Sequence, residues 1–283
     1  METIAEESLY SYADNRQMRK MRCLSIRRSK GCFVDSYIDL ATKIASLQFK
    51  NPNYVMLFRG QKADYRRPNR DHDISTLKPT IFRGVPSPSE KTLTRRFEKL
   101  RRAETLLITA YEQSGFPDLE RLQRHRILRW SILQHYEVCD TPLLDVTHSL
   151  RIAASFASAN ADGEAFVFAL GVPNVSGAIT ASAEAGLQVI RLSSVCPPAA
   201  VRPHIQEGYL LGEYPEMAEM GQKELYPHYE IDFARRVAAK FRFDPRSFWE
   251  NSDFPQVGQL ALYPNTNDPL FELTEAIKLR LKR

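Results

Sequence analysis

Short apolar runs separated by longer helical patterns constrain this chain to a mixed α+β fold. YVMLF at 54–58, EAFVFAL at 164–170 and LQVIRL at 187–192 have the length and character of buried strands. PLLDVT at 142–147 predicts another strand, and HIQEGYLL at 204–211 predicts one with Gly208 inside it. Strands and helices interleave along the chain, so neither an all-α nor an all-β class fits.

Helical spacing of apolar residues predicts the other elements. The predicted helices cover residues 35–49, 90–112, 118–136, 149–159, 229–241 and 268–283, with a short one near Trp249. The sequence has no internal repeat, no low-complexity tract and no long linker. We therefore expect a single compact α+β domain with a small split sheet, antiparallel or mixed, and helical additions at both ends.

Three ranges are expected within this domain. Residues 1–34 are polar and charged and predict an N-terminal arm with little order. Residues 35–215 hold most of the predicted strands and form the expected core. Residues 216–283 are expected to be a C-terminal helical extension packed on that core.

Charge is distributed unevenly along the chain. Residues 1–130 contain 26 Lys and Arg against 15 Asp and Glu, a net charge of +11, and the remainder carries −6. A basic half favours a phosphate-rich partner such as nucleic acid or a dinucleotide, or an acidic protein surface. A long solvated helix rich in arginine would give the same count.

The cysteine pattern and the hydropathy of the sequence indicate the cellular compartment of the protein. Cys23, Cys32, Cys139 and Cys196 form no CxxC pair and no zinc-finger spacing, which predicts reduced thiols and no metal. No run approaches the roughly 18–20 apolar residues of a membrane span, and no secretory signal pattern is visible. These features favour a cytoplasmic protein that does not enter a membrane.

The apolar run at 54–58 leads directly into Arg59, Gly60 and Gln61. An arginine keeps its proton and avoids burial unless an anionic or polar partner meets it. The following glycine allows a turn or a close approach of a ligand. The stretch therefore predicts an anion contact at the end of a buried strand. A structural role for Arg59, as a partner of Asp145 or of a helix C-terminus, is the alternative.

Four clusters recur in a characteristic order. They are FRGQ at 58–61, LQHYE at 133–137, LLDVT at 143–147 followed by AASFA at 153–157, and IQEG at 205–208. Together they resemble the FRG-domain family, named for a (Phe/Tyr)-Arg-Gly motif, over roughly residues 50–215. The family pattern reads FRGQ, LQHYG, LLDWT, an alanine-rich helix and Gln-x-Gly.

The chain departs from that pattern in places. Glu137 stands where the family usually has glycine, and Val146 stands where tryptophan is common. The stretch Val138–Pro142 replaces the expected Pro-Thr-Arg, which removes an expected anion contact. A second Phe-Arg-Gly, at 82–84, is taken as chance.

The layout of the motifs is similar to the ADP-ribosyltransferase fold of the Arg-Ser-Glu type. Arg59 matches its first position, Asp145-x-Thr147 its second, and Gln206-Glu207-Gly208 its third. The resemblance implies an NAD-consuming transferase, a toxin or phage-defence effector that modifies RNA, DNA or a protein, with an antitoxin or inhibitor as a further partner. The alternative is a module that binds a nucleotide or a partner without turnover.

The resemblance also implies roles for individual residues. Arg59 would hold the NAD pyrophosphate, and Glu207 or Asp145 would stabilise the cationic sugar, with Gln206 supplying hydrogen bonds. Strand alternation would put Gln206 and Glu207 on opposite faces. Tyr136 would stack on the nicotinamide, and His135 would act as a base or donor. The full implied NAD-binding set is Phe58, Arg59, Gly60, Gln61, His135, Tyr136 and Thr147.

Structural readings of the same residues stay open. A satisfied histidine at a helix end would explain His135, and an N-cap for the helix at 149–159 would explain Asp145 and Thr147. If the residues are functional, Arg59, Thr147 and Gln206 are expected to line one cleft.

Overall fold

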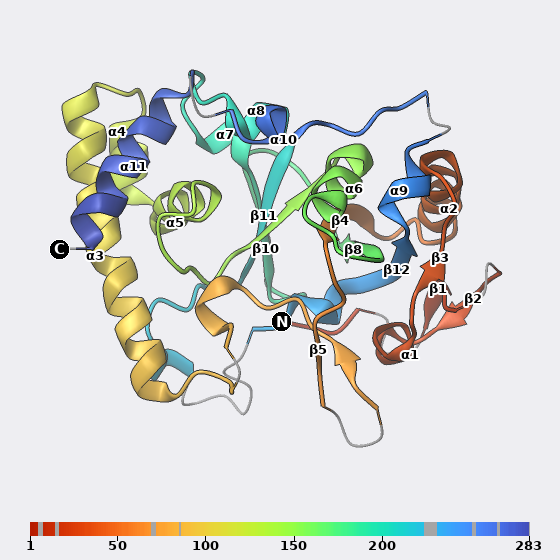
Figure 1. The fold of residues 1–283 in the computed structure, drawn as a ribbon. Coiled ribbons are helices and arrows are strands. Elements are labelled where there is room, and N and C mark those ends of the chain that lie inside the picture. Colours follow the sequence, from red (N-terminus) through yellow and green to blue (C-terminus); the bar gives the residue numbers. More distant parts are fainter. Residues whose placement is uncertain are drawn as a thin grey trace. The chain divides into compact units, whose positions relative to one another are not determined.

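In the computed structural model the chain divides into two compact units, and Figure 1 labels many of their elements. Unit 1 comprises Met1–Leu77, Val146–Val175 and Asp232–Leu262, and unit 2 comprises Lys78–Asp145, Ser176–Ile231 and Tyr263–Arg283. The structure describes residues 1–4, 8–14, 17–68, 72–84, 86–223, 231–250, 253–264 and 267–282. The mixed α+β class is confirmed, but the division differs from a single core over residues 35–215, because each unit combines three separate ranges.

Unit 1 is built on a sheet with long antiparallel pairs. Its strands follow the order β3 (Cys32–Phe33), β12 (Val237–Phe243), β8 (Ala165–Val172), β4 (Val55–Gln61) and β7 (Leu144–Thr147), of which the last two residues of β7 belong to this unit. β8 pairs antiparallel with both β4 and β12, and β3 runs parallel to β12. The central position of β8 buries both of its faces, which explains its continuous apolar run.

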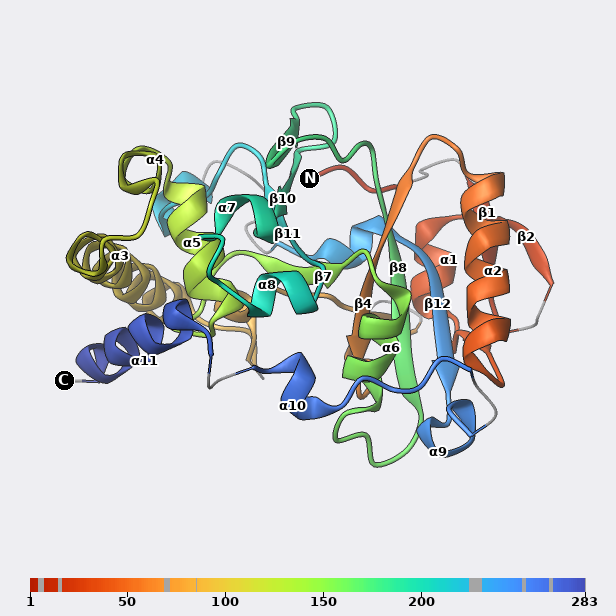
Figure 2. The ribbon, with the colours of Figure 1, turned by 90° about the horizontal axis from the view of Figure 1, so that it is seen from above.

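Helix α6 (Leu150–Ser158) lies against β4 and β8 (Figures 1 and 2). Ala153, Ala154 and Ala157 are fully buried, and their small side chains allow the helix to approach the sheet closely. Unit 1 also contains α2 (Tyr37–Lys50), whose first turn is capped by the Ser36 hydroxyl, which accepts the Asp39 N–H at 3.2 Å. The short helices α9 (Pro245–Phe248) and α10 (Gln259–Leu262) follow β12.

The N-terminal segment contributes structure to unit 1. Its described residues form the hairpin of β1 (Leu9–Tyr12) and β2 (Met18–Met21), helix α1 (Cys23–Arg28) and strand β3. Leu9, Cys23 and Ile26 are buried, and Arg27 pairs with buried Asp232. The expectation of a weakly ordered arm over residues 1–34 is therefore wrong for the described part. The apolar residues that lie between charged residues in this sequence are buried and fix the segment in unit 1.

Unit 2 combines a three-stranded antiparallel sheet with helices. The sheet order is β11 (Gly208–Glu213), β10 (Leu187–Arg191) and β9 (Ile179–Ser182). The helices are α3 (Glu90–Ser114), α4 (Leu119–Arg124), α5 (Arg126–His135), α7 (Leu192–Val195), α8 (Arg202–Ile205) and α11 (Pro269–Leu281). Figures 1 and 2 both show α11 alongside α3. In the described ranges, no helix has the length and apolar character needed to cross a membrane.

The helix expected over 118–136 is broken at His125, which adopts an extended conformation. The guanidinium of Arg129 donates to the carbonyl oxygens of Leu122 and Gln123, both at 2.8 Å. These carbonyls close α4 and need partners where the helix ends. Apolar periodicity runs through the break and gives no sign of this cap.

Two further expectations about secondary structure are wrong. Residues 233–243 form the single turn η3 (Phe233–Arg236) and strand β12, and residues 229–230 of the predicted helix lie outside the described residues. Pairing with β8 overrides the helix preference of the alanines, so residues 216–283 are more than a helical extension. The strand predicted over 204–211 begins at Gly208, because residues 202–205 form α8.

Candidate active site

The Phe-Arg-Gly sequence at 58–60 lies within β4 of unit 1. β4 continues to Gln61, so Arg59 is inside the strand, paired with Phe168 of β8, and the expected position at the strand's end is wrong. Phe58 pairs with Thr147 of β7, which brings two predicted site residues together. Side chains alternate along a strand, so Arg59 and Gln61 point to the face opposite Phe58 and Gly60.

Gly60 allows β4 and α6 to make close contact. A Cβ atom at this position would lie 1.8 Å from the carbonyl oxygen of Ala153 and 2.7 Å from the amide nitrogen of Ala157. No side chain fits in this space. Gly60 is thus explained by helix packing, and the half-buried Arg59 stands on the other face of the sheet.

In unit 2, the Asp145 carboxylate is held by neighbours from α5. Its Oδ2 accepts a hydrogen bond from Gln134 Nε2 at 2.6 Å, and its Oδ1 lies 3.6 Å from His135 Nδ1. The Thr141 hydroxyl donates to Gln134 Oε1 and so fixes the amide that holds Asp145. The Asp145 side chain is 38% exposed, whereas that of His135 is 2% exposed. Solvent therefore reaches a carboxylate whose orientation is fixed from inside.

Burial determines the charge of His135. Burial lowers the pKa of the imidazole, and the Asp145 carboxylate, which acts in the opposite direction, does not reverse the shift. Its Nε2 is buried and has no hydrogen-bond partner in the described part of the chain, which a neutral ring tolerates better than an imidazolium. The ring is therefore neutral at pH 7 and orients Asp145.

The late Gln-Glu-Gly cluster forms a turn between α8 and β11. Gln206 is buried, whereas Glu207 is exposed and has a φ of 44°, in the left-handed region. The expected strand alternation of these two side chains is therefore wrong. A Cβ on Gly208 would lie 2.7 Å from Leu192 Cδ1 and 3.4 Å from His135 Cε1. Gly208 thus leaves room for the Leu192 side chain, and the imidazole lies at an ordinary contact distance.

Tyr136 belongs to the core of unit 2. It is fully buried, and its hydroxyl donates to Asp268 Oδ2 at 2.7 Å. Asp268 also accepts the backbone N–H groups of Val201 and Arg202 and caps α11. In this structure Tyr136 offers no ring face to a nicotinamide. Asp268 was not among the predicted site residues, although its position before Pro269 marks the start of the helix.

Glu137 shows why glycine is usual at its position. Its φ is 55°, a conformation that glycine adopts without strain, and it directly follows the last turn of α5. Its carboxylate accepts from Arg202 Nη2 at 3.2 Å. The departure from the family pattern therefore keeps the backbone turn and adds an ion pair.

Chemically, Asp145 is the group best placed to act. A carboxylate in a fixed orientation that solvent can reach stabilises an adjacent cation or accepts a proton. Across the described residues, no group of three or more His, Cys, Asp or Glu side chains is arranged to hold a metal ion. The expected cleft of Arg59, Thr147 and Gln206 combines residues of both units and stays a prediction.

Fold and site define a mixed α+β protein with an oriented, accessible carboxylate. Comparison with known families identifies an FRG domain in residues 78–165, so the predicted resemblance is confirmed over this range. The match includes the Gln134–Tyr136 and Leu143–Thr147 segments and all of α6. It leaves out residues 58–61 and 202–209 but contains the second Phe-Arg-Gly, at 82–84, which the sequence analysis attributed to chance.

No curated protein and no solved structure matched the chain. The similarity to the ADP-ribosyltransferase fold therefore stays a prediction.

Proposed function

We propose that this FRG-domain protein transfers ADP-ribose from NAD to an acceptor. The supporting observation is the Asp145 carboxylate, which lies in the matched domain, is oriented by Gln134 and His135, and remains accessible. In the proposed reaction the bond between the ribose C1′ and the nicotinamide nitrogen breaks, and its electron pair leaves with nicotinamide. The acceptor then bonds to C1′ and loses a proton. The carboxylate stabilises the positive charge on the sugar between these events.

The role of Arg59 in this proposal comes from the resemblance to transferases. A guanidinium binds phosphate oxygens in a bidentate manner, and its planar, pre-organised shape limits the freedom lost for each hydrogen bond that it forms. Phe58, Gly60 and Gln61 share its strand. Arg59→Ala is expected to weaken NAD binding, which appears as a higher KM for NAD.

The proposed acceptor is nucleic acid, with RNA as the first choice and a protein as the alternative. Support comes from α3, where exposed cations recur at helical spacing at Lys91, Arg95, Lys99 and Arg102. Intervals of four, four and three residues place them along one side of the helix. An enzyme that consumes NAD and modifies RNA would harm its host, which makes a toxin or defence effector with an inhibitor protein the proposed context.

The test measures nicotinamide release and label transfer from NAD labelled in its adenylate half, with RNA, DNA or lysate protein as acceptor. Asp145→Asn is expected to lower the rate about 100-fold or more, as loss of one oriented electrostatic group does. Glu120→Gln, an exposed carboxylate on α4, is the matched control and is expected to keep full activity. Full activity of Asp145→Asn would show that this carboxylate has no role.

One observation favours the alternative of a module that binds without turnover. Transferases of the Arg-Ser-Glu type carry their glutamate on a late strand, whereas here β11 begins after Glu207 and Gln206 is buried. The alternative predicts binding of NAD or a nucleotide with no release of nicotinamide by folded wild-type protein. Including Glu207→Gln in the assay shows whether this exposed carboxylate contributes to turnover.

A further inference from the structure

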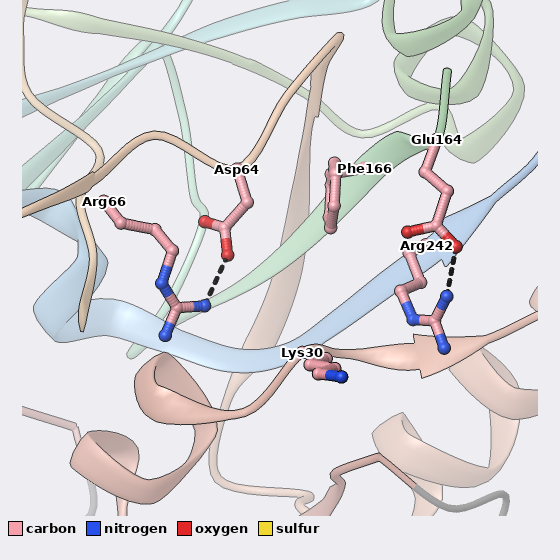
Figure 3. A pocket seen from close by; sticks show the side chains of 6 residues that line it. All are labelled: Lys30, Asp64, Arg66, Glu164, Phe166 and Arg242. Atoms are coloured by element: carbon pink, nitrogen blue, oxygen red, sulfur yellow. Dashed lines mark hydrogen bonds and ion pairs between the residues drawn. The ribbon is translucent and has the colours of Figure 1, made fainter. Parts of the chain in front are cut away.

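Unit 1 contains an open pocket of about 350 Å³ in which charged side chains surround one aromatic ring (Figure 3). Its lining residues are Lys30, Asp64, Arg66, Glu164, Phe166 and Arg242. The transfer reaction proposed above uses none of them. The volume lies within the roughly 300–1,000 Å³ typical of small-molecule sites.

The sheet of unit 1 forms the floor of this pocket. Phe166 of β8 pairs with Arg242 of β12, so the two side chains stand next to each other on the same face. The ring of Phe166 stacks beside Phe168 at a centroid distance of 6.5 Å and an angle of 28°. Arg242 Nε donates to the carbonyl oxygen of Gly31 at 3.2 Å. The floor therefore presents an aromatic ring beside a guanidinium held by the backbone.

A buried ion cluster forms one wall. Asp64 Oδ2 accepts from Lys240 Nζ at 2.8 Å and from Arg66 Nη1 at 3.0 Å. Lys240 is fully buried, and burial lowers its pKa while Asp64 acts in the opposite direction. Arg66 also donates to the carbonyl oxygen of Arg28 at 2.8 Å. These contacts hold the Asp64 side chain, which is 8% exposed, at the edge of the pocket.

The charge of the pocket favours an anion. Its lining has three cationic and two anionic side chains. The ammonium group of Lys240, which is not part of the lining, donates to Asp64 and offsets its negative charge. Glu164 pairs with Arg242 but is 45% exposed, and such exposed ion pairs are weak, so a phosphate can compete for the guanidinium. Lys30 is exposed, and its ammonium has no ion-pair partner among the described residues.

Two buried acceptor oxygens near the floor have no hydrogen-bond donor in the described part of the chain. They are Asp64 Oδ1 and Oε1 of Gln61, which pairs with Phe166 across β4 and β8. Buried polar atoms are normally satisfied, so these two indicate a place for a donor that the chain does not supply.

We propose that this pocket binds a nucleoside monophosphate whose base carries an amino group. The base stacks on Phe166, its amino group donates to Asp64, and the phosphate meets Lys30 and Arg242. Stacking on an aromatic ring accepts any base, and the acceptor oxygens favour adenine and cytosine over uracil. Binding involves no covalent step and does not depend on the transfer reaction.

The experiment is calorimetric titration of the full chain with adenosine 5′-monophosphate. Phe166→Leu and Lys30→Gln are each expected to raise Kd about tenfold, the loss of a stacking contact or of a charge-assisted phosphate contact. Lys20→Gln removes an exposed charge of unit 1 outside the pocket and is expected to leave Kd unchanged. Adenosine and ribose 5-phosphate, which each lack one half of the ligand, are expected to bind more weakly.

Two results would overturn the inference. One is no binding at millimolar nucleotide by protein with a wild-type circular dichroism spectrum. The other is equal Kd values for wild type, Phe166→Leu and Lys30→Gln. Ribose 5-phosphate binding as tightly as the nucleotide would remove the base from the proposal and so refute it. Nicotinamide release is measured separately, so turnover of NAD without binding of the monophosphate rejects this site and leaves the transferase standing, and the reverse result rejects only the transferase.

Discussion

At the scale of single residues, the imidazole of His135 is buried beside a carboxylate that solvent reaches. The ring lies close to Gly208, its Nδ1 is 3.6 Å from Asp145 Oδ1, and the charges of Arg202 and Asp268 also affect its pKa. Burial is the largest influence and lowers its pKa. Protonating this residue in the folded protein therefore requires a lower pH than in the unfolded chain.

This shift makes the stability of unit 2 depend on pH in a definite direction. Between the lowered pKa of folded His135 and about 6.5, the unfolded chain binds more protons, so stability rises with pH across this window and falls on acidification. One such group contributes at most about 1.4 kcal/mol per pH unit. We expect His135→Gln to flatten the dependence between pH 5.5 and 7.

Urea unfolding followed by the fluorescence of Trp130 measures this effect. Trp130 lies on α5, five residues before His135, and Trp249→Phe removes the other tryptophan. His204→Gln, an exposed histidine on α8, is the control and should keep the wild-type slope. A slope in His135→Gln as steep as in wild type would mean that another group causes the pH dependence.

At the scale of elements, the contact of β4 with α6 depends on Gly60. An alanine there would put its Cβ 1.8 Å from the carbonyl oxygen of Ala153. This oxygen belongs to the helix backbone, so it cannot move away by a side-chain rotation. We expect Gly60→Ala to separate the helix from the strand and to destabilise unit 1 by about 3 kcal/mol or more. Thermal unfolding followed by Trp249 fluorescence, in a Trp130→Phe background, measures the change.

Gly163→Ala is the matched control for this substitution. No atom lies within 4 Å of a Cβ built at Gly163, and the residue is exposed. It is expected to change the unfolding temperature little. If both substitutions had the same small effect, the close packing of α6 on β4 would be refuted.

The sequence correctly predicted those elements whose signals, apolar runs and helix caps, come from neighbouring residues. The apolar runs of β4, β8 and β10 and the capped helices α2, α3 and α11 were identified. β12 was taken for a helix because its alanines favour helix, and only its pairing with β8 makes it a strand. The break at His125 depends on Arg129, whose side chain reaches back to α4.

The candidate site likewise has residues that the sequence predicts and residues that it does not. Asp145 and His135 were found because their motifs are contiguous, whereas the roles of Thr141 and Asp268 arise from contacts between distant segments. Arg59 was assigned to the end of a strand because glycine usually marks a break. In the structure Gly60 is present because a helix packs against it, which no pattern around β4 predicts.

At the scale of the whole molecule, the charge asymmetry of the sequence has a structural counterpart in unit 2. The α3 stripe, defined as Lys91, Arg95, Lys99 and Arg102, follows one side of a 25-residue helix and is exposed throughout. With a rise of about 1.5 Å per residue, it extends over roughly 16 Å. Glu98 is the exposed acid within this span, so the stripe remains strongly positive.

If nucleic acid is the acceptor, the α3 stripe is expected to bind its backbone. Binding to nucleic acid weakens as salt rises. Each cation that contacts a phosphate releases counterions and increases the absolute slope of log K against log salt by about 0.7–0.9. Replacing all four residues by glutamine should weaken binding strongly and lower that slope by about 3, measured by fluorescence anisotropy of a labelled RNA between low and moderate salt. If α3 is only a solvated helix without a partner, neither the affinity for RNA nor the salt slope is expected to change.

Net charge alone could mimic this result, so the control removes the same charge elsewhere. Arg19, Lys20, Lys50 and Lys62 are exposed cations of unit 1, and their replacement by glutamine also lowers the net charge by four. Phosphate contacts act within about a Debye length, roughly 8–10 Å at physiological salt, so removal of charges that no phosphate contacts affects the slope little. Equal losses in the two variants would show that RNA responds to total charge and would refute the assignment to α3. A loss confined to the α3 variant, with nicotinamide release from NAD alone unchanged, would separate recognition of the acceptor from the chemistry at Asp145.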